Sequence, residues 1–120
     1  MIADIMLDTD VLLYAAMGAK AAPEKFAIAR DIILNEDYAT SAQILSDFYT
    51  ASTMQGTVPL TPDKARQWVT QLARKPCQDI TADILGDALD LHLAQDIALP
   101  LAQTICAAQT LGTLRLYTQS

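Results

Sequence analysis

The segment Ile5–Tyr14 constrains the fold more than any other part of the sequence. It reads Ile-Met-Leu-Asp-Thr-Asp-Val-Leu-Leu-Tyr: a short apolar run, two acids separated by one threonine, and a second apolar run. This order is typical of a buried strand that ends in carboxylates and is followed at once by a helix. In open parallel sheets, ligand and metal sites lie at the carboxyl ends of strands. The segment therefore predicts that Asp8 and Asp10 stand at such an edge.

A second interpretation of these residues is purely structural. Asp and Thr are favoured N-cap residues, because their side chains accept hydrogen bonds from the free backbone N–H groups at the start of a helix. Asp8, Thr9 or Asp10 could therefore serve only to cap the helix that follows. An isolated Asp-x-Asp pattern favours this interpretation, so the choice depends on the rest of the chain.

The composition predicts one folded domain over residues 1–120, which is long enough to bury a single core. Hydrophobic residues make up 52% of the chain and charged residues 18%, as expected for a sheet covered by helices on both faces. No apolar run approaches the roughly 18 residues that span a membrane, and no signal peptide is recognisable. Cys77 and Cys106 have neither metal-ligand nor CxxC spacing, so we expect reduced thiols in a cytoplasmic protein.

The charge limits how the chain could bind nucleic acid. Its net charge is −6, with only eight Lys and Arg residues, whereas binding a phosphate backbone relies on such cations. Four of the eight fall within twelve residues: Lys64, Arg66, Arg74 and Lys75. They are candidate nucleic-acid contacts, although we favour the alternative that they form a solvated helix face.

Strand and helix signals alternate along the chain. We expect strands over residues 3–8, 38–40, 77–80 and 114–118, and helices over residues 10–17, 23–34, 42–54, 62–75, 82–94 and 100–111. Pro23 and Pro62 suit first helical turns, and Gly112 suits a left-handed helix end. The alternation predicts an α/β/α fold of three layers, with a parallel sheet of about four strands. In the helix over residues 42–54, Asp47 borders the apolar arc, where its carboxylate can lean over the sheet edge.

Three segments, in this order, resemble the PIN-domain family. Residues 7–15 are similar to its opening, Asp-Thr-Asn before a Val-Leu-Leu-Tyr-like run, and residues 39–49 resemble a Ser-x-Gln-Val-Leu run that leads to an acid and Phe-Tyr. Residues 88–118 keep the spacing of the third block. The family's members are mostly Mg²⁺- or Mn²⁺-dependent ribonucleases, and many are the toxins of toxin–antitoxin pairs.

The resemblance implies a cluster of four acids at the carboxyl edge of the sheet. Mg²⁺ is usually held by one or two carboxylates together with phosphate and water, and further carboxylates position the water that attacks phosphorus. Asp8 matches the first acid and Asp47 the second, so both are candidate catalytic residues and metal ligands. Asp10 stands where the family usually has Asn. It is a further candidate ligand, or it caps the helix.

The other two acids of the family are missing from this chain. Counted back from Gly112, the third acid falls on Leu101. The fourth, which in the family follows the threonine matched by Thr118, falls on Ser120. Most members have a further strand-forming segment after this point, so the domain could be truncated at its C-terminus. Together with the two missing acids, the resemblance implies a PIN-like protein that has a degenerate site and has lost its Mg²⁺ or Mn²⁺. Its role would be binding or regulation, with an antitoxin-like partner, RNA or a second copy in a homodimer.

Two other functions remain to be compared with this one. The first is an active Mg²⁺- or Mn²⁺-dependent endonuclease of single-stranded RNA that uses Asp8, Asp10 and Asp47. The second is a receiver-like phospho-acceptor domain, which also sets an acidic pair at a strand end, but the sequence has no Lys near the last strand. His92 lies among leucines, and we interpret it as a surface or core-edge residue rather than a catalytic base.

Overall fold

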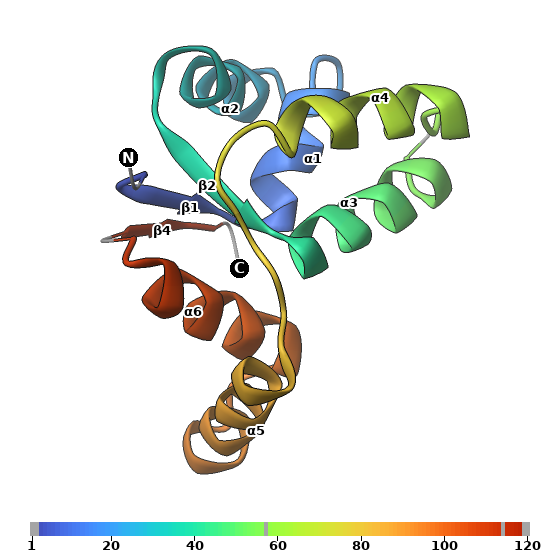
Figure 1. The fold of residues 1–120 in the computed structure, drawn as a ribbon. Coiled ribbons are helices and arrows are strands. Elements are labelled where there is room, and N and C mark those ends of the chain that lie inside the picture. Colours follow the sequence, from blue (N-terminus) through green and yellow to red (C-terminus); the bar gives the residue numbers. More distant parts are fainter. Residues whose placement is uncertain (1–2, 57, 114, 119–120) are drawn as a thin grey trace.

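The computed structural model describes residues 3–56, 58–113 and 115–118, which form a parallel sheet with helices packed around it (Figure 1). In chain order the elements are β1 (Ile5–Leu7), α1 (Thr9–Met17), α2 (Pro23–Asn35), β2 (Tyr38–Ser41), α3 (Ala42–Met54), α4 (Pro62–Leu72), β3 (Cys77–Gln78), α5 (Ala82–Gln95), α6 (Leu99–Leu111) and β4 (Arg115–Tyr117). Each corresponds to an element predicted from the sequence. Local signals therefore specified the order of strands and helices correctly.

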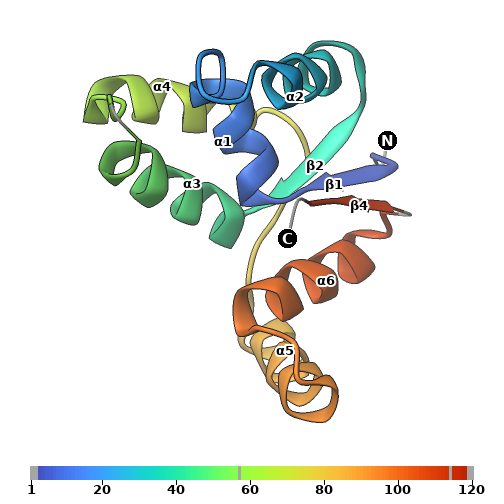
Figure 2. The same cartoon turned by 180° about the vertical axis from the view of Figure 1, so that it is seen from behind.

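The strands pair in the order β3-β2-β1-β4, and every pairing is parallel. All four carboxyl ends consequently lie at one edge of the sheet. Figures 1 and 2 show α1 and α2 over one face and α6 over the other, with α5 beyond α6. α3 leaves the sheet at its carboxyl edge. The α/β/α architecture with a four-stranded parallel sheet, predicted from the alternation of elements, is confirmed.

The core lies around β1, an internal strand that pairs with β2 on one side and β4 on the other. All three of its residues are buried, because helices cover both faces, and this explains its continuous apolar run. Leu12 of α1 and Phe48 of α3 are fully buried beside it. The ring of Phe48 packs against Trp68 of α4, with 6.2 Å between ring centroids. This packing fixes α3 against the rest of the molecule.

The helices α5 and α6 share a second, smaller cluster of buried side chains, made by Ile84, Ala88, Ala102 and Cys106. α6 ends at Gly112, which has a φ of 86°, the left-handed conformation predicted for it. Figure 1 shows α5 projecting away from the sheet on the far side of α6. Within the described residues, no helix is both long and apolar enough to cross a membrane.

The glycine at the end of α1 is required by a close backbone contact. The N–H of Gly18 donates to the Tyr14 carbonyl at 2.9 Å, and a Cβ on Gly18 would lie 2.6 Å from that same oxygen. Gly86, in the middle of α5, is a matched contrast, since a Cβ there would meet nothing within 4 Å.

We predict opposite effects of alanine at these two glycines. Gly18→Ala should lower the free energy of unfolding by roughly 1–3 kcal/mol, because the chain must shift to accommodate the methyl group. Gly86→Ala should raise it by about 0.5–1 kcal/mol, because alanine favours the helix. Urea unfolding followed by circular dichroism measures both. Equal stability of the two variants would contradict the contact at Gly18.

Candidate functional site

A groove of about 400 Å³ opens beside the carboxyl end of β1, between α1, α3 and α6. Its polar wall contains Asp8, Thr9 and Asp10, which lie at the start of α1, and Asp47 of α3. The remaining lining is Leu13, Ala51, Gln55, Ala98, Pro100, Leu101 and Thr104. We call this the acidic groove. It brings together four of the positions singled out in the sequence, Asp8, Asp10, Asp47 and Leu101, although they are spread over more than 90 residues.

Asp8 is positioned by the sheet. Its backbone N–H donates to the Tyr117 carbonyl at 3.0 Å, which extends the pairing of β1 with β4 by one residue. Its Oδ1 accepts a hydrogen bond from the Thr9 N–H at 2.8 Å, and Asp8 is the N-cap of α1. The capping interpretation is therefore correct for Asp8, but it does not exclude a second role, because the same residue lines the acidic groove.

Thr118 joins the two acids at the strand end. Its Oγ1 lies 3.1 Å from Oδ2 of Asp8 and 3.4 Å from Oδ2 of Asp10, within hydrogen-bonding distance of both. The sequence predicted residue 118 only as the end of the last strand and did not predict this contact. The available signal was topological: a residue that directly follows a strand paired in parallel with β1 must emerge at the same sheet edge as Asp8.

Asp47 is held from its own helix. Gln43, one turn earlier in α3, donates from Nε2 to Oδ1 of Asp47 at 2.8 Å. Ser41 begins the helix, and its Oγ accepts the Ile44 N–H at 3.1 Å. The cap and the buried arc of α3 set the rotation of the helix, and with it the direction of Asp47 toward the acidic groove.

The electrostatics of the groove disfavour three charged carboxylates. Burial raises the pKa of the Asp8 carboxyl above its ordinary value of 3.8, and the negative charges of Asp10 and Asp47 raise it further. Hydrogen bonds from Thr9 and Thr118 oppose this effect without cancelling it. A positive group bound in the groove would relieve both the desolvation and the repulsion.

The residues present do not fit a preformed Mg²⁺ or Mn²⁺ site. In the part of the chain that the structure describes, no three His, Cys, Asp or Glu side chains form a group that could hold a metal ion. Thr118 and Gln43 already contact carboxylate oxygens of Asp8 and Asp47. Leu101 lines the groove at the position that the resemblance assigns to the third acid. Ser120, the position of the fourth, lies outside the described residues.

The four basic residues proposed as nucleic-acid contacts do not line the acidic groove. Arg66 lines a different groove, between α3 and α4, on the side of α3 opposite Asp47. Lys75 lies near the amino end of β2, where its Nζ is 3.9 Å from Oδ1 of Asp37 and 5.5 Å from the centre of the Tyr38 ring. Lys64 and Arg74 are exposed. The cluster is thus separate from the acids in space.

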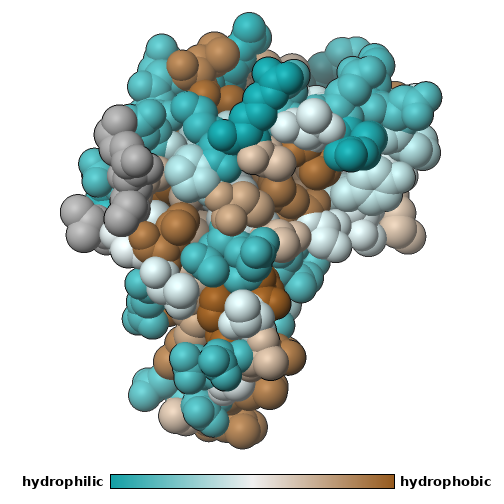
Figure 3. Space-filling view, viewed as in Figure 1, coloured by the Kyte–Doolittle hydropathy of each residue, from teal (hydrophilic) through white to brown (hydrophobic). Residues whose placement is uncertain are grey.

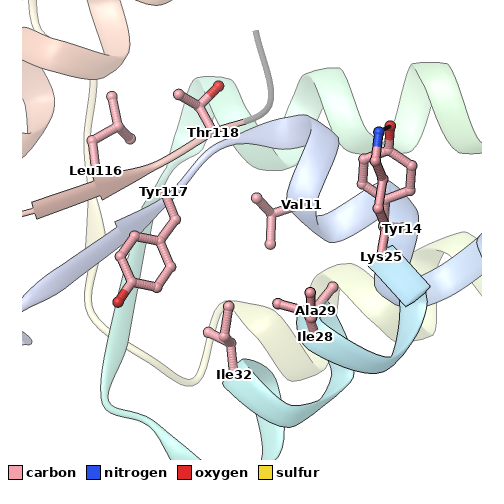
Figure 4. Close-up of a pocket in the computed structure, with 9 residues that line it drawn as sticks. All are labelled: Val11, Tyr14, Lys25, Ile28, Ala29, Ile32, Leu116, Tyr117 and Thr118. Carbon is pink, nitrogen blue, oxygen red and sulfur yellow. Dashed lines mark hydrogen bonds between the residues drawn. The ribbon is translucent and has the colours of Figure 1, made fainter.

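Thr118 also borders an apolar groove of about 290 Å³ between α1, α2 and β4. Figure 4 shows Val11, Ile32 and Tyr117 around this groove, with Lys25 close to Tyr14 at the other end. The Nζ of Lys25 lies 3.3 Å from the Tyr14 hydroxyl. His92, by contrast, lines neither groove: its Nδ1 contacts the Ile97 carbonyl at the turn between α5 and α6.

Comparison with solved structures shows that the protein has the fold of the PIN-domain toxins. VapC20 of Mycobacterium tuberculosis, described as a sarcin-ricin loop cleaving toxin, matches with a TM-score of 0.77 at 14% identity, over 97% of this chain and 89% of its own. VapBC2 of Rickettsia felis, solved with a DNA fragment from its promoter, matches with a TM-score of 0.65 at 15% identity, over 97% of this chain and 86% of its own.

Sequence comparison adds no closer relative: no family profile matches the chain, and no curated protein sequence matches it. The TM-scores of 0.77 and 0.65 establish the fold, which the three segments of the sequence predicted, and at 14% and 15% identity they establish the fold alone.

We predict that Asp8→Asn stabilises the protein at pH 7. An acid with a raised pKa in the folded state binds more protons there than in the unfolded chain, so stability falls as the pH rises through that interval. Asparagine removes the charge and can still accept the Thr9 N–H. The melting temperature should therefore rise at pH 7, and the gain should fade as the pH is lowered past the raised pKa toward 3.8.

Differential scanning fluorimetry across this pH range measures the effect, and Asp4→Asn, at an exposed position just before β1, is the control. A melting temperature that Asp8→Asn leaves unchanged or lowers at pH 7 would contradict the unfavourable charge at Asp8.

Proposed function

We propose that this chain is a PIN-fold protein related to the ribonucleases of toxin–antitoxin systems, with a degenerate metal site and a binding or regulatory role. The observation that carries the proposal is Leu101, which lines the acidic groove together with Asp8 and Asp47. An aliphatic side chain cannot order the waters of a hydrated divalent ion, whereas a carboxylate at that position could.

The lining of the acidic groove is chemically complementary to a ligand with a cationic tip and an apolar stem. Asp8, Asp10 and Asp47 contribute carboxylates to the lining, and Leu13 and Leu101 contribute apolar side chains. An arginine side chain has this composition: its methylene stem packs on apolar surface, and its guanidinium donates in a plane to carboxylates. We therefore propose that the groove receives a basic side chain of an antitoxin-like partner.

One observation favours the second candidate, an active Mg²⁺- or Mn²⁺-dependent endonuclease of single-stranded RNA that uses Asp8, Asp10 and Asp47. These three carboxylates line one groove, and the charges of Asp10 and Asp47 raise the pKa of Asp8, so a bound cation would relieve this repulsion. VapC20, which shares the fold, is described as cleaving the sarcin-ricin loop. RNA binding, a homodimer and a cytoplasmic location are further proposals, which rest on the sequence and its resemblance to the family.

The test is to restore the missing acid. Leu101→Asp should bind Mn²⁺ at least about tenfold more tightly than the wild type, because carboxylates dominate affinity for hard divalent ions. Leu101→Asn is the matched control, with nearly the same shape and no charge. Isothermal titration measures affinity, and a fluorescent single-stranded RNA measures cleavage by each protein with and without Mn²⁺. The wild type should bind in the millimolar range at best and should not cleave.

Wild-type cleavage that requires Mn²⁺ and disappears in Asp8→Asn would overturn the degenerate site and establish the endonuclease. The binding role has its own test. Titration with arginine amide should perturb the NMR signals of the residues that line the acidic groove, whereas citrulline amide, the neutral analogue, should not. Equal perturbation by both compounds would contradict the role of the carboxylates.

A further inference from the structure

The outward side of α5 carries a row of exposed leucines. Leu85, Leu89 and Leu93 follow one another at intervals of four residues, and 38%, 39% and 78% of their surfaces are exposed. A different side of the same helix buries Ile84 and Ala88 against α6. α5 is therefore apolar on two sides, but only one of them is covered. At helical spacing, such a row forms the contact surface for a second helix.

A row of aspartates runs beside the leucines. Asp83, Asp87 and Asp90 are exposed on α5. At 100° per residue Asp90 lies about 60° round the helix from Leu93, and Asp83 and Asp87 follow just beyond it. Among the described residues, none of the three forms an ion pair. Figure 3 shows hydrophobic and hydrophilic surfaces side by side on this end of the molecule. The two rows together make an amphipathic surface, which we call the α5 face.

The charge around the α5 face is unbalanced. Residues 76–114 contain five aspartates and neither lysine nor arginine, so this region carries five of the six net negative charges of the chain. Every lysine and arginine lies in the other parts of the sequence. The negative potential is thus concentrated around α5, where no cation of the same segment reduces it.

We propose that the α5 face is a docking surface for a basic amphipathic helix of a partner protein. The leucine row supplies apolar contact for one side of such a helix, and the aspartates attract its lysines and arginines and set its orientation. This charge pattern disfavours a second copy of the chain in a two-fold arrangement, since the aspartate rows of the two copies would face each other. The surface is distinct from the acidic groove and does not depend on the function proposed for that groove.

A designed peptide tests the proposal on the full chain. The probe is an 18-residue helix with leucines along one side and lysines on the rest, labelled with fluorescein and followed by anisotropy. The double variant Leu89→Ser/Leu93→Ser should weaken binding about tenfold or more, because it removes the central apolar contacts. The triple variant Asp83→Asn/Asp87→Asn/Asp90→Asn should weaken it to a similar extent, and added salt should reduce wild-type binding.

The helix α2 offers matched controls at exposed positions. Leu34→Ser repeats the loss of an exposed leucine, and the triple variant Glu24→Gln/Asp31→Asn/Glu36→Gln repeats the change in net charge. Both control proteins should bind the probe like the wild type, and a scrambled peptide of the same composition should bind the wild type at least about tenfold more weakly.

Three outcomes would overturn the proposal. In the first, the control variants lose affinity for the probe as much as the α5 variants do. In the second, the scrambled peptide binds as tightly as the designed one. In the third, light scattering reveals a dimer of the wild type that Leu89→Ser/Leu93→Ser dissociates and the control variants do not. The last result would assign the α5 face to a second copy of this chain.

Discussion

The parallel pairing of β1 with a strand on each side is the constraint on which the rest of the structure depends. The pairing with β4 brings Thr118 to Asp8 across 110 residues of sequence, with 3.1 Å between Oγ1 and Oδ2. The pairing with β2 sets where α3 begins, and therefore where Asp47 lies. Because the pairings are parallel, every strand delivers its last residue to the same edge. Local motifs place each acid at the end of its strand or on its helix, and the topology of the sheet brings them into one groove.

The acidic groove combines features that work against each other. Its carboxylates are partly withdrawn from water, which raises the pKa of Asp8, and the apolar side chains of Leu13 and Leu101 complete the lining. In a site built for a hydrated ion, a further acid would be expected in place of Leu101. In a site for a basic side chain, the same leucine contributes packing. The choice between the two candidate functions therefore depends on one residue of α6 more than on the acids themselves.

The sequence predicted features that neighbouring residues determine, such as helix ends. It missed contacts between residues that only the tertiary structure brings together. Ser41 and Gly112 mark helix ends through their own chemistry, so the boundaries that they set were predictable. Asp47 was placed by helical periodicity and by the family resemblance. The contact of Thr118 with Asp8 depends on strand order, which the sequence does not state. The same holds for Arg66 and Lys75, which are close in sequence to other cations but lie away from the acids.

The helix α6 belongs to two surfaces at once, and this has a mechanical consequence. Ala102 and Cys106 pack against α5, while Leu101 and Thr104, on neighbouring positions of the same helix, line the acidic groove. A helix moves as a rigid rod, so a tilt imposed from the α5 side would carry Leu101 with it. Asp8, in contrast, is anchored to the central strand by its backbone. The position of Leu101 thus follows from the packing of α6 on both α5 and the central core, where Ala107 and Ala108 are buried, whereas the position of Asp8 follows from the sheet.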